Sequence, residues 1–214
     1  NNKNFNIPII KEMWALIDCF DISTKIINDL FDGIESDLKE IVQLNSKKDL
    51  LIYSYRVAGS VGLMMAKILN VKNQSALKSA IDLGIAMQLT NISRDVVEDA
   101  KNNRSYISAN FDSIKETLKL ADLFYESSFS SINKIPLSFR FSILVARRVY
   151  RQIGYNILKK KNIENYNNSG KIYVNNISKI IQTILSIYDL IKLSLIKSGD
   201  HLRDKEHQLI NEEI

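Results

Sequence analysis

The 214-residue chain has few of the residues that interrupt helices or crosslink a fold: seven glycines, two prolines and one cysteine. Scarce glycine and proline argue against a turn-rich β fold and favour helices. The single cysteine, Cys19, excludes a disulfide framework within the chain and fits a reducing compartment. Because Cys19 has no cysteine or histidine nearby in the sequence, we expect it to pack in the core and not to hold a metal.

Long apolar runs and clustered charges are also missing. No run of about 18 apolar residues occurs, so no transmembrane helix is predicted, and no secretory signal is recognised. The net charge is +5, but the basic residues are scattered and form no stripe interleaved with aromatic residues, so nucleic-acid binding is not expected. His201 and His207 lie in a polar C-terminal stretch without an obvious partner.

Apolar residues recur at intervals of three and four almost throughout, which indicates a succession of helices. We expect helices at 7–19, 23–31, 34–45, 48–70, 74–101, 111–133, 137–161 and 174–198. The polar stretch 165–170 is expected to be a loop, and the tail 198–214 is expected to fray. With no internal repeat and no linker, the whole chain, 1–214, is predicted to form a single all-α domain.

The segment Gln88–Ala100 carries oxygen-bearing side chains at helical spacing. Asn91, Asp95 and Asp99 stand at i, i+4 and i+8, so a helix stacks them along one face, with Gln88 one turn earlier. Carboxylate and amide oxygens are the ligands that hard divalent cations such as Mg²⁺ prefer. This oxygen column, formed by Asn91, Asp95 and Asp99, therefore indicates a magnesium site.

An Asp-x-x-x-Asp pair on an amphipathic helix is more often a solvated face. Here the preceding Leu83–Met87 is apolar and small, which is typical of a buried helix, so the polar groups that follow are directed into a cavity. Arg94 beside the column and Arg104 just beyond it can contact phosphate oxygens that the same metal bridges. The segment thus favours a diphosphate site held through magnesium.

A second pattern, Tyr53–Ala66, places two glycines inside a predicted helix. Each of Gly59 and Gly62 costs roughly 1 kcal/mol relative to alanine in a helix interior. Close contact between two helices would explain them, and so would a groove that stays open for a long apolar ligand. Tyr53 lies upstream, where its hydroxyl can reach a charged group deeper in such a cavity. Both explanations of the glycines remain open.

Two segments, Tyr53–Ala66 and Leu83–Tyr106, resemble the paired signatures of the squalene/phytoene synthase family. Their sequences are most similar to those of bacterial phytoene synthases. Gly33–Leu38 resembles the family's Gly-x-x-x-Asp-Leu segment, and Ala146–Gly154 resembles a later helix. The resemblance extends over residues 10–195. It implies an all-α, prenyl-synthase-type helical bundle around a central cavity.

Family members join two prenyl diphosphates head to head. The resemblance implies that two geranylgeranyl diphosphates condense to phytoene through a cyclopropyl diphosphate, in carotenoid biosynthesis, with magnesium (or manganese in its place) and without NADPH. Squalene or dehydrosqualene synthesis from farnesyl diphosphate is a close alternative. A non-catalytic family member with an assembly role is an alternative of another class, which the retained Asp95 and Asp99 disfavour for the parent protein.

Matching positions also imply residue roles. The implied magnesium ligands are Asn91, Asp95 and Asp99. The implied catalytic residues are Tyr53, Arg94, Asp95, Asp99 and Tyr106. The implied substrate-binding residues are Gln88, Asn91, Arg94, Arg104, Tyr166, Val57, Ala58 and Gly62. Tyrosine rings and hydroxyls near the reacting carbons would steady cationic character.

The chain departs from the family pattern at its beginning. Relatives carry a first aspartate-rich motif on an early helix opposite the second, whereas this chain, from Asn1 on, enters the pattern after that helix. We therefore expect a bundle that is N-terminally incomplete, with half of the metal site and little or no activity alone. Ser108 in place of a proline and Lys171 in place of an arginine are smaller departures near the diphosphate. A cytoplasmic protein with peripheral contact at the inner membrane is expected, because the substrate and product tails are hydrophobic.

Overall fold

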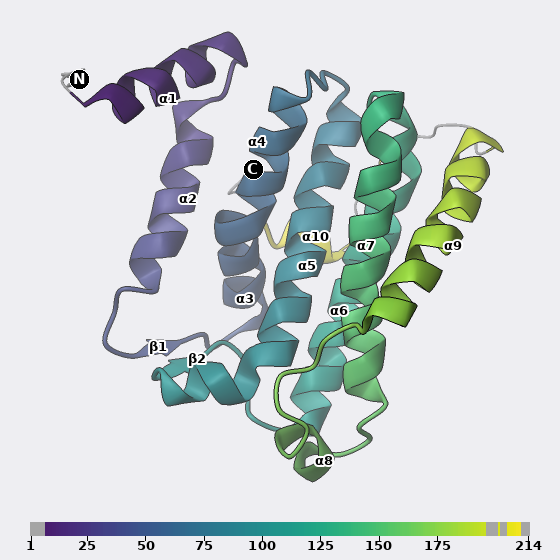
Figure 1. Ribbon diagram of the computed structural model, residues 1–214. Coiled ribbons are helices and arrows are strands. Elements are labelled where there is room, and N and C mark those ends of the chain that lie inside the picture. Colours follow the sequence, from purple (N-terminus) through teal and green to yellow (C-terminus); the bar gives the residue numbers. More distant parts are fainter. Residues whose placement is uncertain (1–6, 196–200, 202–204, 211–214) are drawn as a thin grey trace.

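The structure is a computed structural model that describes residues 7–195, 201 and 205–210 (Figure 1). Its helices are α1 (Pro8–Cys19), α2 (Thr24–Ser36), α3 (Lys47–Ser54), the π-helical η1 (Tyr55–Gly59), α4 (Ser60–Ile68), α5 (Gln74–Lys101), α6 (Phe111–Phe129), the 3-10 helix η2 (Ser130–Lys134), α7 (Leu137–Leu158), α8 (Ile163–Asn167), α9 (Asn176–Leu195) and α10 (Lys205–Gln208). Two short strands, β1 (Val42–Gln43) and β2 (Arg104–Ser105), pair in parallel. The predicted all-α class is confirmed.

The long helix α5 lies at the centre of the bundle, between α4 and the α6–α7 pair (Figure 1). It begins where the Asn73 side chain accepts a hydrogen bond from the backbone N–H of Ala76, at 3.1 Å. Ile81, Ile85 and Leu89 recur every fourth residue and are almost completely buried, so they form the stripe that packs into the core. Other faces of the same helix remain for polar groups.

Local patterns located most helix boundaries, but three segments differ from their predictions. The helix predicted at 34–45 is wrong: α2 ends at Ser36, and the chain then extends so that β1 can pair with β2, far away in sequence. The predicted continuous helix 48–70 contains the π-helical turn η1. The predicted loop 165–170 overlaps α8, whose start the Asn162 side chain caps.

The described part of the C-terminal segment also differs from its prediction. His207 and Ile210 are buried, so residues 205–210 are docked on the bundle and do not fray. In Figure 1 this short α10 passes behind α5. His201 is described too, and its side chain is buried, while the remaining residues of the predicted fraying tail lie outside the described residues. Cys19 is exposed at the end of α1, which contradicts its expected place in the core, because α1 lies across one end of the bundle and buries only Ile17.

Candidate functional site

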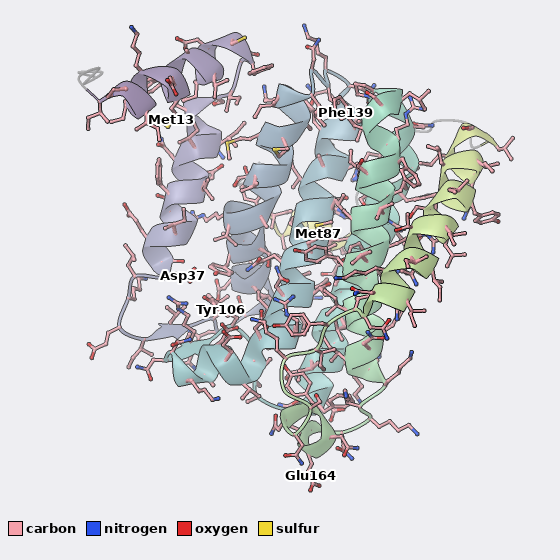
Figure 2. The ribbon with its side chains drawn as sticks, viewed as in Figure 1. Met13, Asp37, Met87, Tyr106, Phe139 and Glu164 are labelled. Carbon is pink, nitrogen blue, oxygen red and sulfur yellow. The ribbon has the colours of Figure 1, made fainter. Side chains whose placement is uncertain are left out.

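A cavity of about 370 Å³ lies alongside α4 and α5, with η2 and α7 completing its wall. Most of its lining is apolar and includes Val57, Ala58, Gly62, Met65 and Met87. Met87 projects from the middle of α5 (Figure 2). The lining residues of α5 run from Ser79 to Asn91, which spans about 18 Å of helix. This is a long apolar groove, and Gln88 and Asn91 make its α5 wall polar toward the C-terminal end of that helix.

The glycines of the groove allow α4 and α5 to approach closely. A Cβ added at Gly62 would lie 2.3 Å from the carbonyl oxygen of Ala80, and one added at Gly84 would lie 2.3 Å from that of Ala58. The helix-contact explanation is therefore confirmed. Gly62 and Ala58 also line the cavity, so the same small residues keep the groove open. Gly62 therefore lies both at the helix contact and in the cavity wall, and a long apolar ligand in this groove stays a prediction.

The π-helical turn η1 connects α3 to α4 at the edge of this cavity. Such turns insert one extra residue into a helix and are frequent at functional sites. Here Tyr55 is buried and donates a hydrogen bond to Asp29 at 2.8 Å, while Val57 and Ala58 face the cavity. Within this one short turn, Tyr55 therefore packs in the core while Val57 and Ala58 line the groove.

The oxygen column of α5 continues beyond the cavity. The buried Oδ1 of Asn91 has no hydrogen-bond partner among the described residues, although buried polar atoms rarely lack one. One turn on, Asp95 accepts two hydrogen bonds from Arg94, at 2.9 and 2.6 Å. Lys171 Nζ lies 3.4 Å from Asp95 and donates to Glu98 at 2.7 Å. Arg94 and Lys171 therefore already neutralise Asp95, whereas Asn91 offers an unused ligand atom.

Asp99, the next residue of the column, is short of positive charge. Partial burial and the nearby Asp95 raise the pKa of its carboxyl from 3.8 to about 6, and the Arg104 guanidinium only partly opposes this. A carboxyl in that state binds a proton or a cation more readily than a solvated one. The Asp99 carboxyl therefore lacks a full counter-charge among the described residues.

Asp37 joins two of the predicted catalytic residues. Its carboxylate accepts hydrogen bonds from Tyr53 at 2.8 Å and from Tyr106 at 2.7 Å, and the two rings stack with centroids 4.7 Å apart. Figure 2 shows Asp37 and Tyr106 together where the chain leaves α2. Arg104 donates to the backbone carbonyl of Asp37 at 3.3 Å. The sequence prediction omitted Asp37 from the site, although it is the carboxylate of the Gly-x-x-x-Asp-Leu segment.

Both tyrosines keep their protons at neutral pH. Burial raises the pKa of Tyr106 to about 12, and burial together with the hydrogen bonds to Tyr106 and Asp37 raises that of Tyr53 further. Tyr166 also keeps its proton: burial raises its pKa to about 12. Its hydroxyl lies 3.0 and 2.8 Å from the carbonyl oxygens of Ser93 and Arg94, so the structure directs it at the backbone of α5.

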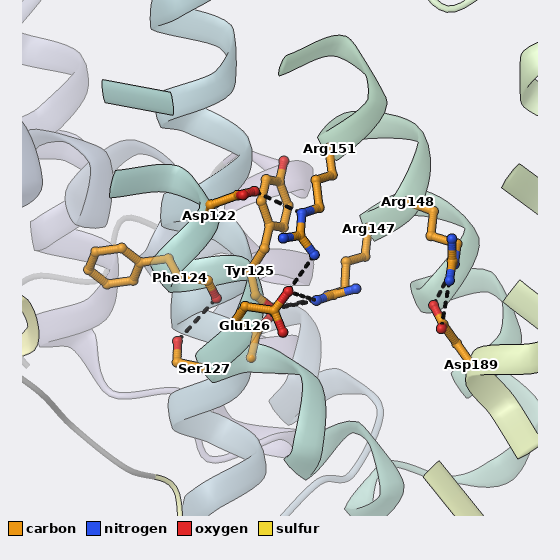
Figure 3. Close-up of polar contacts among 10 residues, drawn as sticks. Asp122, Phe124, Tyr125, Glu126, Ser127, Arg147, Arg148, Arg151 and Asp189 are labelled. Carbon is orange, nitrogen blue, oxygen red and sulfur yellow. Dashed lines mark hydrogen bonds and ion pairs between the residues drawn. The ribbon is translucent and has the colours of Figure 1, made fainter. Parts of the chain in front are cut away.

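Three arginines of α7 contact neighbouring helices (Figure 3), and none of them is among the residues that line the cavity. Arg147, Arg148 and Arg151 reach from α7 to neighbouring helices and hold them together. Their partners are the Tyr125 carbonyl oxygen for Arg147, Asp189 of α9 for Arg148, and Asp122 and Glu126 of α6 for Arg151. From the same helix Tyr150 lines the cavity. The sequence prediction missed Tyr150, which only its place in the segment Ala146–Gly154 could have suggested.

Known proteins resemble this chain in sequence and in fold. The sequence model of the Squalene/phytoene synthase family matches residues 2–111, which is more than half of the chain. A 15-cis-phytoene synthase of Paracoccus sp. is 36% identical over 149 residues, covering 61% of this chain and 49% of the relative. Phytoene synthase 1, chloroplastic, of Zea mays is 30% identical over 184 residues, covering 72% and 43%. The chain spans about half the length of these curated relatives.

A solved structure shares the fold. It is a dehydrosqualene synthase in complex with a ligand, with a TM-score of 0.65 and 25% sequence identity, and the match covers 87% of this chain and 72% of that one. The prenyl-synthase-type arrangement of helices predicted from the sequence is therefore confirmed.

Proposed function

The chain belongs to the squalene/phytoene synthase family, and on that premise we propose that it acts as a prenyltransferase that joins two geranylgeranyl diphosphates head to head. The product would be phytoene, made through a cyclopropyl diphosphate in carotenoid biosynthesis. One observation carries the proposal: an apolar cavity reaches Asn91, and Asp95 and Asp99 continue along the same helix. The cavity suits an isoprenoid tail and the column suits its diphosphate.

The residues of the column fit a magnesium ion. All of their ligand atoms are oxygens, as hard cations require, and the buried Oδ1 of Asn91 lacks a partner among the described residues. Asn91, Asp95 and Asp99 would hold Mg²⁺, or Mn²⁺ in its place. The bound ion would offset the negative charge that grows on a departing diphosphate. Loss of a proton would end phytoene formation, so NADPH is not required.

The protein side chains would position the substrate and protect the cation. Arg94 can exchange its bidentate contact with Asp95 for a similar contact with phosphate oxygens, and Arg104 and Gln88 would contact further oxygens. The stacked rings of Tyr53 and Tyr106 would face the carbons that become cationic. Val57, Ala58 and Gly62 would keep water away from these carbons, because they belong to the apolar wall. Tyr166 would support Arg94 through the backbone of α5.

Full turnover is expected to need acidic side chains from a second segment. The curated relatives are about twice as long as their matched regions, and the column approaches the cavity from one helix of the described chain. An allylic diphosphate ionises readily only when its growing charge is neutralised from more than one side. A segment equivalent to the unmatched N-terminal part of a relative would supply the opposing carboxylates.

Product analysis by chromatography tests this proposal. Geranylgeranyl diphosphate and Mg²⁺ would be incubated with the chain alone and with the N-terminal segment of the Paracoccus relative, fused or added in trans. We expect phytoene without NADPH only when the segment is present. Efficient phytoene synthesis by the chain alone would show that no second segment is needed. A completed protein that makes squalene only with NADPH would rule out the phytoene assignment.

Dehydrosqualene synthesis from farnesyl diphosphate is the second candidate, because a dehydrosqualene synthase is among the solved structures with this fold. Parallel assays with farnesyl and geranylgeranyl diphosphates at equal concentration separate the two candidates. A clear preference for the shorter substrate would favour the second.

We also propose a cytoplasmic location with peripheral contact at the inner membrane, since the tails of substrate and product are hydrophobic. Within the part of the chain that the structure describes, no helix has both the length and the apolarity to cross a bilayer. Membrane fractions washed with high salt check the proposal. Release by salt agrees with peripheral contact, and release by detergent alone contradicts it.

A further inference from the structure

A second polar cluster lies on α5, away from the oxygen column. It joins Asp82 of α5 to His201 and His207 of the C-terminal segment. Asp82 and Asp95 are separated by about 20 Å along the helix. The sequence prediction gave the histidines no partner, and this is wrong, because the docked C-terminal segment brings both of them to a carboxylate that is more than 100 residues away in the chain.

The hydrogen-bond donors of the cluster converge on one oxygen atom. Oδ2 of Asp82 lies 2.6 Å from Nε2 of His201, 3.0 Å from Nε2 of His207 and 2.5 Å from the hydroxyl of Ser127. The other carboxylate oxygen of Asp82 and Nδ1 of His201 have no hydrogen-bond partner among the described residues. Three groups crowd one point while two buried polar atoms are unused, which is an inefficient arrangement for hydrogen bonds alone.

The cluster is also sealed from solvent. The side chain of Asp82 is 0% exposed, and those of His201 and His207 are 1% exposed. Its ion-pair partners among the described residues are the two histidines, which carry charge only when protonated. A buried carboxylate costs much free energy unless a positive charge accompanies it.

We propose that Asp82, His201 and His207 bind a zinc ion, or a transition metal of similar preference, that fastens the C-terminal segment to α5. Imidazole nitrogen and carboxylate oxygen are common zinc ligands, and Mg²⁺ does not favour imidazole. One ligand atom from each residue lies within 4.8 Å of the others. A water molecule or the Ser127 hydroxyl would take the fourth position.

The distances fit a site that closes around the ion. Tetrahedral zinc with bonds of about 2.0 Å separates its ligand atoms by about 3.3 Å. The separations of 2.6 and 3.0 Å between Oδ2 and the two imidazole nitrogens are slightly shorter. Side-chain shifts of less than an ångström would lengthen these two contacts to the separation in a zinc site. The proposal is independent of the proposed catalytic function, because it uses none of the residues of the oxygen column.

The composition of the chain makes the test sharp. His201 and His207 are its only histidines, and the exposed Cys19 is its only cysteine. The whole chain, stripped with a chelator, would be titrated with zinc chloride in the presence of excess Mg²⁺, which competes with zinc for the oxygen ligands of the column. We expect one zinc per chain and a higher thermal unfolding midpoint with zinc. His207→Ala should weaken zinc binding by about 100-fold or more, and Cys19→Ser should leave it unchanged.

Cobalt(II) gives a readout that needs no variant. In the unaltered chain it should show the intense visible bands of a tetrahedral site, and zinc should displace it. If His207→Ala does not fold, Asp82→Asn with the same titration replaces it. Absence of stoichiometric zinc and of the cobalt bands would overturn the proposal and leave a hydrogen-bonded cluster only. Equal zinc affinity in the folded His207→Ala variant would overturn it as well.

Discussion

Asp82 and Asp99 lie on the same helix and behave in opposite ways. Burial alone would raise the pKa of Asp82, but hydrogen bonds from His201 and His207 outweigh it and the pKa is lowered. Asp99 is less buried, yet its pKa is raised to about 6, because burial and Asp95 act in the same direction and Arg104 compensates too little. Partners, and not the depth of burial, therefore decide the sign of the shift.

The difference lies in the partners that the described residues give to each carboxylate. At Asp82 the protein supplies its own imidazole partners, so the charge stabilises the fold. At Asp99 the described residues compensate the charge only in part, through Arg104, and the proposed magnesium ion would complete the compensation. Functional sites commonly combine perturbed pKa values in this way.

The largest expected effect is on stability, at the Asp82 cluster of α5. Asp82→Ala removes the carboxylate that two buried histidines share, and we expect the free energy of unfolding to fall by about 3–5 kcal/mol. Chemical denaturation at neutral pH measures it. Asp112→Ala is the matched control, because Asp112 is an exposed aspartate on α6 that forms an ion pair with Lys115, and it should change little. An equal loss of unfolding free energy in the two variants would contradict the proposed stabilising role of Asp82.

At Asp95 and Asp99, near the C-terminal end of α5, we expect a loss of ligand binding and not of stability. Asp95→Ala and Asp99→Ala should each abolish magnesium-dependent binding of a non-hydrolysable prenyl diphosphate analogue, because each removes a charged ligand. Calorimetric titration measures the affinity. Glu98→Ala is the control on the same turns, since Glu98 is exposed and lies outside the column. Unchanged affinity in both aspartate variants would refute the metal assignment.

The raised pKa of Asp99 predicts a specific pH dependence. Above about pH 6 the carboxyl is ionised in both the folded and the unfolded protein, and its burial beside Asp95 destabilises the fold. As the pH falls from 6 toward 3.8 the folded state takes up the proton first, so metal-free stability rises. The unfolding free energy of Asp99→Asn should therefore exceed that of the unaltered chain at pH 7, and the excess should vanish below pH 4.

Magnesium affinity should change in the opposite sense, because a protonated carboxyl is a poor ligand. The magnesium affinity of the unaltered chain should decline as the pH falls through 6. An affinity that stays constant from pH 7 to pH 5 would contradict the raised pKa.

The smallest expected effect is on stability and concerns the hydrogen bond from Tyr53 to Asp37. Tyr53→Phe removes one of the two hydroxyls that hold the Asp37 carboxylate and should cost about 1 kcal/mol of unfolding free energy. Tyr188→Phe, at an exposed tyrosine of α9, is the control and should be neutral. If Tyr53→Phe is also neutral, the hydroxyl of Tyr106 alone holds Asp37.

Local periodicity was sufficient for much of the fold. The predicted helix 74–101 agrees with α5 at both ends, because an Asn73 cap and a regular apolar stripe are local signals. The column Asn91–Asp95–Asp99 follows from the same periodicity. The short β1–β2 pairing overruled the helical pattern at 34–45, because it joins Val42 to Arg104 and no local pattern encodes such a partner.

The sequence by itself determined the helical class, the position of α5 and the oxygen column, because 3.6-residue periodicity is a property of neighbouring residues. Only the tertiary structure decided which polar groups meet. It placed Asp37 against Tyr53 and Tyr106, left Cys19 exposed and brought His201 and His207 to Asp82. These contacts join segments that are distant in sequence. Which side chains become partners, and which remain exposed, therefore depends on how the helices pack and not on residue spacing.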